Sequence, residues 1–139
     1  DGSDSAENIV YVFTDPNCPY CKRLWNDARP WVDAGKVQLR HVMVGVLGES
    51  SQKKAAYLLS TKNPQAALKD NESGKKPAQE IKTIADQQRQ QLDDNQQLMA
   101  RLGASGTPAI LYLDPTGMLQ MHPGAPQGEQ LIELFGPRP

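Results

Sequence analysis

Cysteine is scarce in this sequence, which contains two in 139 residues. Two cysteines are too few for a small secreted domain held together by several disulfides. They also cannot supply by themselves the four ligands of a structural zinc site. The two histidines, His41 and His122, lie far from the cysteines along the chain, so no Cys2His2 spacing is present. The composition therefore predicts neither a disulfide-stapled scaffold nor a metal centre, and no separate cofactor is expected.

Long hydrophobic runs and an excess of one charge are also missing. No apolar stretch approaches the length of a transmembrane helix, so we expect no membrane insertion. The 16 acidic and 15 basic residues give a net charge of −1. Because the two signs are interspersed, the sequence gives no reason to propose nucleic acid or an anionic membrane as a partner.

The length of 139 residues suits one compact domain with a modest extension. Residues 1–7 are polar and contain no signal peptide. We interpret them as a disordered linker or a remnant of expression, and the natural protein is then longer and already processed. The folded domain is predicted to span residues 8–139.

The first third of the chain predicts a β-α-β unit. Residues 8–14 are rich in β-branched and aromatic side chains, which indicates a buried strand. Apolar residues then recur at helical spacing, which predicts a helix with one buried face, at Leu24, Trp25, Ala28 and Val32. Pro30 is expected to interrupt this helix and Gly35 to end it. Residues 37–46 predict a second strand, parallel to the first.

The middle of the chain, residues 49–102, has no strand pattern and predicts a helical insertion. The expected helices lie at residues 55–59, 63–74, 77–89 and 93–102, the last two as one helix or as two. After the insertion we expect a strand, a tight turn, an antiparallel strand and a helix, at residues 109–113, 114–117, 118–122 and 127–135. The order of elements is β-α-β, helices, β-β-α, which indicates an α/β fold.

Both cysteines stand in one tetrad, Cys18-Pro19-Tyr20-Cys21, between the first strand and its helix. A pair with this spacing can form and break a disulfide within one helical turn, which predicts redox chemistry. Free N–H groups and the helix dipole stabilise an anion at a helix start, so we expect the pKa of Cys18 to fall to about 3.5–7.5. Cys21 belongs to the buried face, where burial raises the pKa of a thiol. Cys18 is therefore the predicted nucleophile, and Cys21 is predicted to resolve the mixed disulfide.

Four other residues are predicted to tune the redox couple or to bind substrate. Pro19 takes the first helical position and stiffens the turn, and the Tyr20 ring covers the sulfurs or contacts substrate. Thr107 and Pro108 directly precede the strand at residues 109–113, a position where proline is tolerated. A cis Thr107–Pro108 bond would expose backbone groups that can pair with an extended substrate.

Several segments resemble the thioredoxin superfamily, and more narrowly the catalytic domain of the bacterial periplasmic disulfide isomerases DsbC and DsbG. These segments are residues 13–22, 28–33 and 106–109. The tetrad, the Arg-Pro-Trp-Val segment and parts of residues 37–46 resemble DsbG more closely. The resemblance covers almost the whole chain from residue 8. It implies a thioredoxin fold with a helical insertion between its halves, Thr107-Pro108 as the cis-proline loop, and disulfide isomerase or reductase activity.

The resemblance also implies a cellular setting. The location would be the bacterial periplasm, and the substrates would be unfolded or oxidised proteins. Electrons would come from a membrane thiol reductant of the DsbD type. The family normally carries an N-terminal dimerisation domain with no counterpart here, so a homodimer is expected only if the full protein has that domain.

Other interpretations remain open from the sequence. One is reduction of cysteine sulfenic acids on single-cysteine proteins, which the resemblance to DsbG also implies. Another is a non-catalytic, chaperone-like binder of extended polypeptide that keeps its disulfide only as a staple. A glutaredoxin-like use of glutathione is disfavoured by the long helical insertion. Near the tetrad, Asp15 is expected to cap the turn into the helix rather than to transfer protons, and His41 is expected to be structural.

Overall fold

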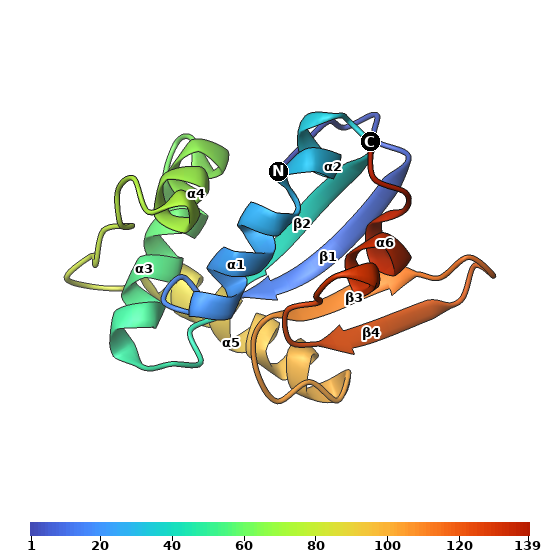
Figure 1. Cartoon of the computed structure of the whole chain (residues 1–139). Helices are drawn as coiled ribbons and strands as arrows, with labels where there is room; N and C mark the ends of the chain where they lie inside the picture. Colours follow the sequence, from blue (N-terminus) through green and yellow to red (C-terminus); the bar gives the residue numbers. More distant parts are fainter.

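The computed structural model describes residues 1–139 and contains a four-stranded sheet with helices on both faces (Figure 1). The strands are β1 (Asn8–Thr14), β2 (Val37–Met43), β3 (Ala109–Leu113) and β4 (Leu119–Pro123). The helices are α1 (Pro19–Asp27), α2 (Arg29–Asp33), α3 (Glu49–Ser60), α4 (Pro64–Ser73), α5 (Asp86–Arg101) and α6 (Glu129–Phe135). None of these helices has the length and hydropathy that a membrane span requires.

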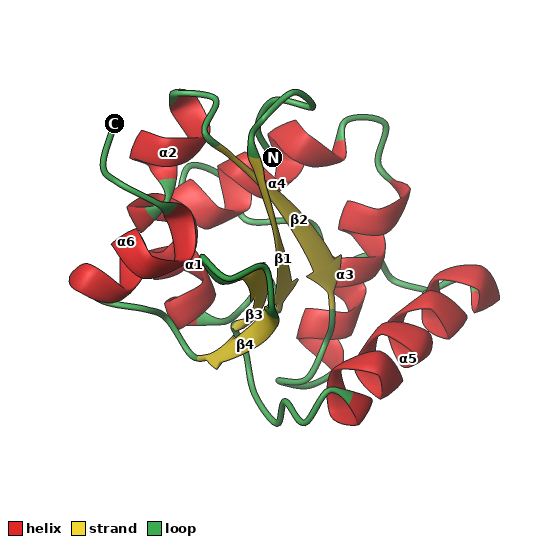
Figure 2. Ribbon diagram, turned by 90° about the vertical axis from the view of Figure 1, so that its right-hand side faces the viewer, coloured by secondary structure: helices red, strands yellow, loops and turns green.

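The sheet has the strand order β2-β1-β3-β4, which places β1 and β3 in its centre. β1 runs parallel to β2, with Asn8 opposite Val37 and Thr14 opposite Met43. β3 is antiparallel to β1, and β4 is antiparallel to β3. Figure 2 shows the strands twisting past one another, with the helices arranged around them. The predicted β-α-β unit and the late β-hairpin are both confirmed.

Alternating side chains of β1 point to opposite faces of the sheet. Val10 and Val12 join the main apolar cluster, which α1, α2 and α6 complete on one face. Phe13 points the other way and packs with Met99 of α5. In Figure 1, α1 and α6 accordingly lie in front of the sheet and α5 behind it. Both faces of the sheet are thus covered, and the start of α1 lies at the carboxyl end of β1.

The predicted interruption of the first helix is confirmed. α1 ends at Asp27, and Pro30 falls in the first turn of the short helix α2, where its missing N–H costs least. Gly35 ends α2 with a φ of 73°, which glycine adopts readily. The apolar positions predicted from helical spacing are all buried: Leu24, Trp25, Ala28 and Val32.

The helical insertion is confirmed, although its first helix, α3, begins at Glu49 and not at residue 55. Two further boundaries are corrected, one inside the insertion and one in the strand before it. α4 begins at Pro64 and ends before Gly74, as predicted, but residues 77–85 are not helical. They pack Ala78 and Ile84 into the apolar cluster of the insertion, and the Ala78 N–H donates to Asn71 Oδ1 at 2.9 Å. The second correction concerns β2, which ends at Met43 although strand character continues to residue 46.

The first seven residues contact the domain, although their polar character predicts a disordered segment. The Leu39 N–H of β2 donates to the Asp1 carbonyl at 2.8 Å. The Asp1 carboxylate accepts two hydrogen bonds from the Arg29 guanidinium, at 2.6 and 3.0 Å. Gln38 donates to Asp4 at 2.8 Å. These polar contacts join the segment to the edge strand β2 and to α2.

Candidate active site

The start of α1 carries both cysteines, beside the carboxyl end of β1 (Figure 1). Cys18 is the N-cap residue, with φ and ψ of −79° and 118°, and Pro19 lies in the first helical turn. The Cys21 N–H donates to Cys18 Sγ at 3.3 Å. This N–H is one of the donors that a helix start leaves without a backbone acceptor. The Cys18 sulfur therefore lies where the sequence predicts it.

The turn between β1 and α1 is fixed by Asp15, whose side chain is fully buried. One carboxylate oxygen accepts from the Asn17 N–H at 2.8 Å and from the Ser51 hydroxyl at 2.7 Å. The other accepts from the Leu47 N–H at 3.0 Å. The Asp15 carbonyl accepts from the Cys18 N–H at 3.0 Å. Asp15 thus caps the turn, as predicted, and also ties it to α3.

Both cysteines are free thiols in this structure, and both are recessed. The exposed fraction is 4% for Cys18 and 3% for Cys21. The sequence led us to expect that burial would separate the two residues. The exposed fractions therefore do not distinguish the two residues.

Hydrogen bonding separates the two thiols. The hydrogen bond from the Cys21 side chain lowers the pKa of Cys18 to about 6, although burial opposes this. Contacts with the Thr107 side chain and with the backbone of Cys21 and Tyr20 act in the same direction. Cys21 is the donor of this hydrogen bond and would lose the bond on ionisation. The bond therefore raises the pKa of Cys21 far above that of a free thiol, and burial raises it further. At neutral pH the pair therefore holds one thiolate, at Cys18, and one thiol, at Cys21.

The Thr107–Pro108 loop lies against the cysteine pair. Its peptide bond is cis, and Cys18 Sγ lies 3.4 Å from the Thr107 carbonyl oxygen. The Pro108 carbonyl accepts from the Gly124 N–H at 2.8 Å, which ties the loop to the end of β4. A cavity of about 460 Å³ adjoins the loop, lined by residues 103–107, Met121, Pro123 and Gly124. The topology thus brings Thr107 to Cys18 from 89 residues away.

Tyr20 is 60% exposed, although it stands between two recessed cysteines. Its ring, which has an apolar body and a polar tip, is therefore accessible from solvent. The predicted site residues therefore form one group, with Tyr20 as its exposed member.

The two histidines are not part of this group. His41 is buried in β2, and burial lowers its pKa to about 3. Its Nδ1 lies 2.8 Å from the Thr14 hydroxyl, and its Nε2 lies 3.5 Å from the Asp1 carboxylate. His122 contacts the Gly124 carbonyl at 3.2 Å through Nδ1. The prediction that His41 is structural is consistent with these contacts.

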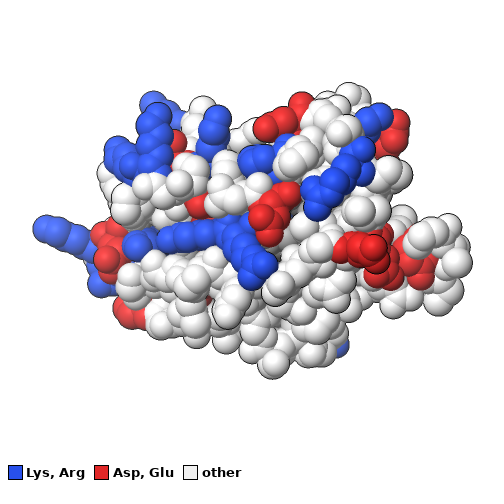
Figure 3. All heavy atoms as spheres, in the orientation of Figure 1, with Lys and Arg blue, Asp and Glu red and all other residues white.

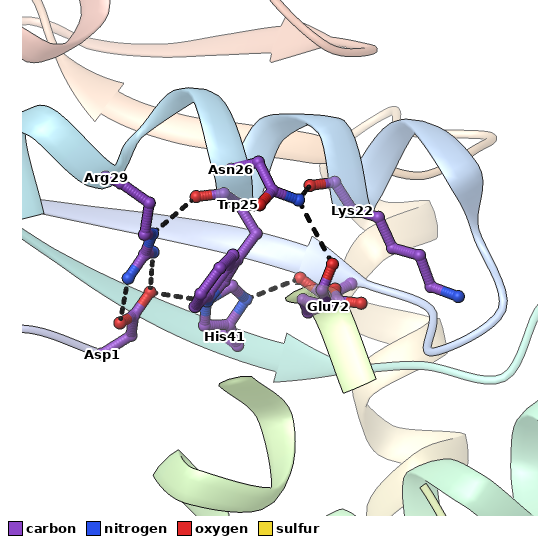
Figure 4. A network of polar contacts seen from close by, with 8 residues as sticks. Asp1, Lys22, Trp25, Asn26, Arg29, His41 and Glu72 are labelled. Atoms are coloured by element: carbon purple, nitrogen blue, oxygen red, sulfur yellow. Dashed lines mark hydrogen bonds and ion pairs between the residues drawn. The ribbon is translucent and has the colours of Figure 1, made fainter. Parts of the chain in front are cut away.

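Sequence reasoning missed two buried polar residues at the end of α4, Asn71 and Glu72, each 2% exposed. The Asn71 amide donates to the Pro16 carbonyl at 2.9 Å and to Glu72 Oε2 at 3.1 Å. The Glu72 carbonyl accepts from the Asn26 amide of α1 at 3.2 Å (Figure 4). Asn71 therefore lies against the turn that precedes Cys18, and Glu72 lies against α1. In the sequence they resemble the polar end of a surface helix, and no local pattern indicates that they are buried.

The structure holds no group of three or more His, Cys, Asp or Glu side chains placed to bind a metal ion. Both signs of charge are present over the face of the molecule in Figure 3, consistent with the net charge of −1.

Comparison with curated proteins gives two strong matches. The chain is 52% identical to the thiol:disulfide interchange protein DsbG of Pseudomonas aeruginosa, over 99% of this chain and 55% of that protein. It is 44% identical to the protein of the same name from Escherichia coli, over 98% of this chain and 56% of that protein. The chain thus spans about half the length of these relatives. The resemblance to DsbG inferred from the motifs is confirmed.

Solved structures and family models agree with these matches. A periplasmic thioredoxin-like protein from Salmonella enterica serovar Typhimurium superposes with a TM-score of 0.75 and 25% identity, covering 97% of this chain and 86% of that one. A disulfide interchange protein from Neisseria gonorrhoeae gives a TM-score of 0.71 and 25% identity, covering 97% and 90%. The model of the thioredoxin-like domain matches residues 3–136. The predicted thioredoxin fold is therefore confirmed, and the chain belongs to the thioredoxin-like domain family.

Proposed function

We propose that this chain is the catalytic domain of a thiol–disulfide oxidoreductase that reduces or isomerises protein disulfides through Cys18 and Cys21. The observation that carries the proposal is the geometry of the cysteine pair: Cys18 Sγ accepts the Cys21 N–H at the start of α1 and lies 3.4 Å from the Thr107 carbonyl oxygen. Consistent with this geometry, the pKa of Cys18 is lowered and that of Cys21 is raised. A thiolate at neutral pH is the attacking species in disulfide exchange, and a neutral neighbour does not compete for the substrate.

The reaction begins when the Cys18 thiolate attacks one sulfur of a substrate disulfide. A mixed disulfide forms, and the second substrate sulfur leaves as a thiolate that takes a proton. Cys21 then loses its proton and attacks Cys18 Sγ, which releases the reduced substrate and leaves a Cys18–Cys21 disulfide. If a second substrate cysteine attacks the mixed disulfide first, the substrate is isomerised and the pair stays reduced.

The loop at Thr107 and Pro108 and the exposed ring of Tyr20 are proposed to receive the substrate. The Thr107 carbonyl lies beside Cys18 Sγ, so a peptide segment bound along this loop would bring its own sulfur to the reactive one. Pro19 is proposed to tune the couple by fixing the first turn of α1. Because Cys18 is recessed, an extended or unfolded segment reaches it more readily than a rigid surface does.

The periplasm is the proposed location, and unfolded or oxidised proteins are the proposed substrates. Support comes from the match to a Salmonella protein described as periplasmic and from the two DsbG relatives. After each reduction the cysteine pair is left as a disulfide, so a thiol donor must reduce it again. A membrane thiol reductant of the DsbD type is the proposed donor.

Matched serine variants test the proposal in an insulin reduction assay and with scrambled ribonuclease. Cys18→Ser is expected to abolish activity, because no nucleophile remains. Cys21→Ser is expected to form mixed disulfides with protein substrates, which non-reducing gels detect. Full activity of Cys18→Ser would refute the mechanism. Turnover only on a sulfenylated single-cysteine protein would instead favour sulfenic acid reduction, and binding of unfolded chains without turnover would favour the chaperone-like binder.

A further inference from the structure

Glu72, at the end of α4, is a buried ionisable group that packs near the cysteine turn and has no part in the proposed reaction. Its side chain is 2% exposed, and its Oε1 has no hydrogen-bond partner. Its Oε2 accepts from the Asn71 amide at 3.1 Å. A carboxylate with one unpaired oxygen is costly to bury, whereas the neutral acid is far less so.

Hydrogen bonds connect the end of α4, which carries Glu72, to the turn before Cys18 and to α1. Asn71 links the Glu72 carboxyl to the Pro16 carbonyl, and Pro16 stands two residues before Cys18. On α1, Cys18, Lys22 and Asn26 follow at intervals of four, which places them on one helix face. Asn26 donates to the Glu72 carbonyl from that face. The end of α4 therefore packs against α1, and Figure 4 shows Glu72 beside Asn26.

The groups around Glu72 shift its pKa in opposite directions. Burial raises the pKa of Glu72 to about 8, and the negative charges of Cys18 and Asp15 add to the rise. Lys22 of α1 and the hydrogen bond from Asn71 oppose it. Among these charges, only that of Cys18 disappears when the cysteine pair is oxidised.

We propose that Glu72 is a positioning residue of the Cys18–Cys21 couple, whose proton occupancy follows the charge on the Cys18 sulfur. This inference rests on the proposed function, because it needs Cys18 to alternate between thiolate and disulfide. Glu72 contacts neither substrate nor sulfur, and it acts through the electrostatic free energy of the thiolate.

A thiol donor gives two electrons to the Cys18–Cys21 disulfide, whose S–S bond breaks, and the donor becomes a disulfide. The Cys21 sulfur takes one proton as a thiol, and the Cys18 sulfur remains a thiolate. The new negative charge increases the proton affinity of Glu72, which takes up part of a second proton from water. Oxidation reverses each of these changes.

The test is the equilibrium of the couple with reduced and oxidised glutathione between pH 6 and pH 9, in the wild type and in Glu72→Gln. Glutamine has the shape of the neutral acid. At pH 6 the two proteins are expected to have the same equilibrium constant. At pH 9 the ionised Glu72 of the wild type disfavours the thiolate, so the variant is expected to be more reduced. A threefold difference would correspond to Glu72 pKa values about 0.5 apart in the two redox states.

Asp70→Asn is the matched control, because it removes one negative charge from the same helix at a half-buried position. The equilibrium constant of Asp70→Asn with glutathione is expected to equal that of the wild type at every pH. Carboxyl ¹³C NMR of the wild type gives a second readout that needs no variant. The Glu72 pKa is expected to be higher in the reduced protein than in the oxidised one.

The outcomes separate this inference from the function it rests on. A Cys18–Cys21 pair that does not equilibrate with glutathione at any pH would refute the proposed function. If the pair does equilibrate, two results would refute only the role of Glu72. One is an equal Glu72 pKa in both redox states. The other is a ratio of the Glu72→Gln and wild-type equilibrium constants that does not change with pH.

Discussion

The ionisation of Cys18 provides the most detailed prediction, because its main cause can be removed by one substitution. The hydrogen bond from the Cys21 side chain contributes most to the low Cys18 pKa of about 6. Cys21→Ala removes that donor, whereas Cys21→Ser keeps a hydroxyl in its place. We expect Cys21→Ala to raise the Cys18 pKa by at least about one unit, which corresponds to about 1.4 kcal/mol.

The effect on the reactive species at neutral pH follows directly. With a pKa of about 6, about nine-tenths of Cys18 is thiolate at pH 7, and with a pKa of about 7 the fraction falls to about one half. A thiol of ordinary pKa would be only a few per cent ionised. Cys21→Ala is therefore expected to lose reactivity toward thiol reagents at pH 6–7 more than at pH 9.

Thiolate absorption at 240 nm, followed from pH 4 to pH 10, measures these midpoints. The reduced wild type should show one transition near pH 6, and Cys18→Ser should lack this transition. The midpoint of Cys21→Ser should lie between those of the wild type and Cys21→Ala. A wild-type midpoint above 8, or identical midpoints in the wild type and Cys21→Ala, would refute the reasoning.

Three further predictions concern stability. Asp15→Ala leaves the partners of a fully buried carboxylate unpaired and is expected to lower the free energy of unfolding by about 3 kcal/mol in urea titrations; a loss under 1 kcal/mol would contradict its assigned role. Gly45→Ala places a Cβ 2.5 Å from Gln52 Cγ and should cost about 1–3 kcal/mol, whereas Gly106→Ala, whose Cβ meets nothing within 4 Å, should cost little. The low Cys18 pKa stabilises the reduced protein above about pH 8.5, and this gain of about 3 kcal/mol is lost as the pH falls through about 6. The reduced wild type should therefore lose more stability than Cys18→Ser between pH 8 and pH 5, and equal losses would contradict the assignment.

The parts of the fold that local chemistry determines were predicted well from the sequence. The strand at residues 8–14 follows from its β-branched and aromatic side chains, and the break between α1 and α2 follows from Pro30. The position of both cysteines at a helix start follows from the strand pattern before them and the apolar spacing after them. In each case the residues that carry the signal are neighbours in the chain.

The parts that depend on distant contacts were not predictable. The helix expected over residues 77–89 fails because Ala78 and Ile84 pack into the insertion, and only the folded structure reveals that site. Glu72 stands on a polar helix and becomes buried because α4 packs against α1. The near-equal exposure of the two cysteines likewise depends on the cover provided by the Thr107 loop, which is 89 residues away from Cys18.

The central claim is that one of two equally recessed sulfurs is ionised at neutral pH and the other is not. The most direct measurement is alkylation of the reduced wild type with one equivalent of iodoacetamide at pH 7, followed by peptide mapping. The label is expected on Cys18 and not on Cys21. Equal labelling of the two cysteines, or a preference for Cys21, would contradict the account.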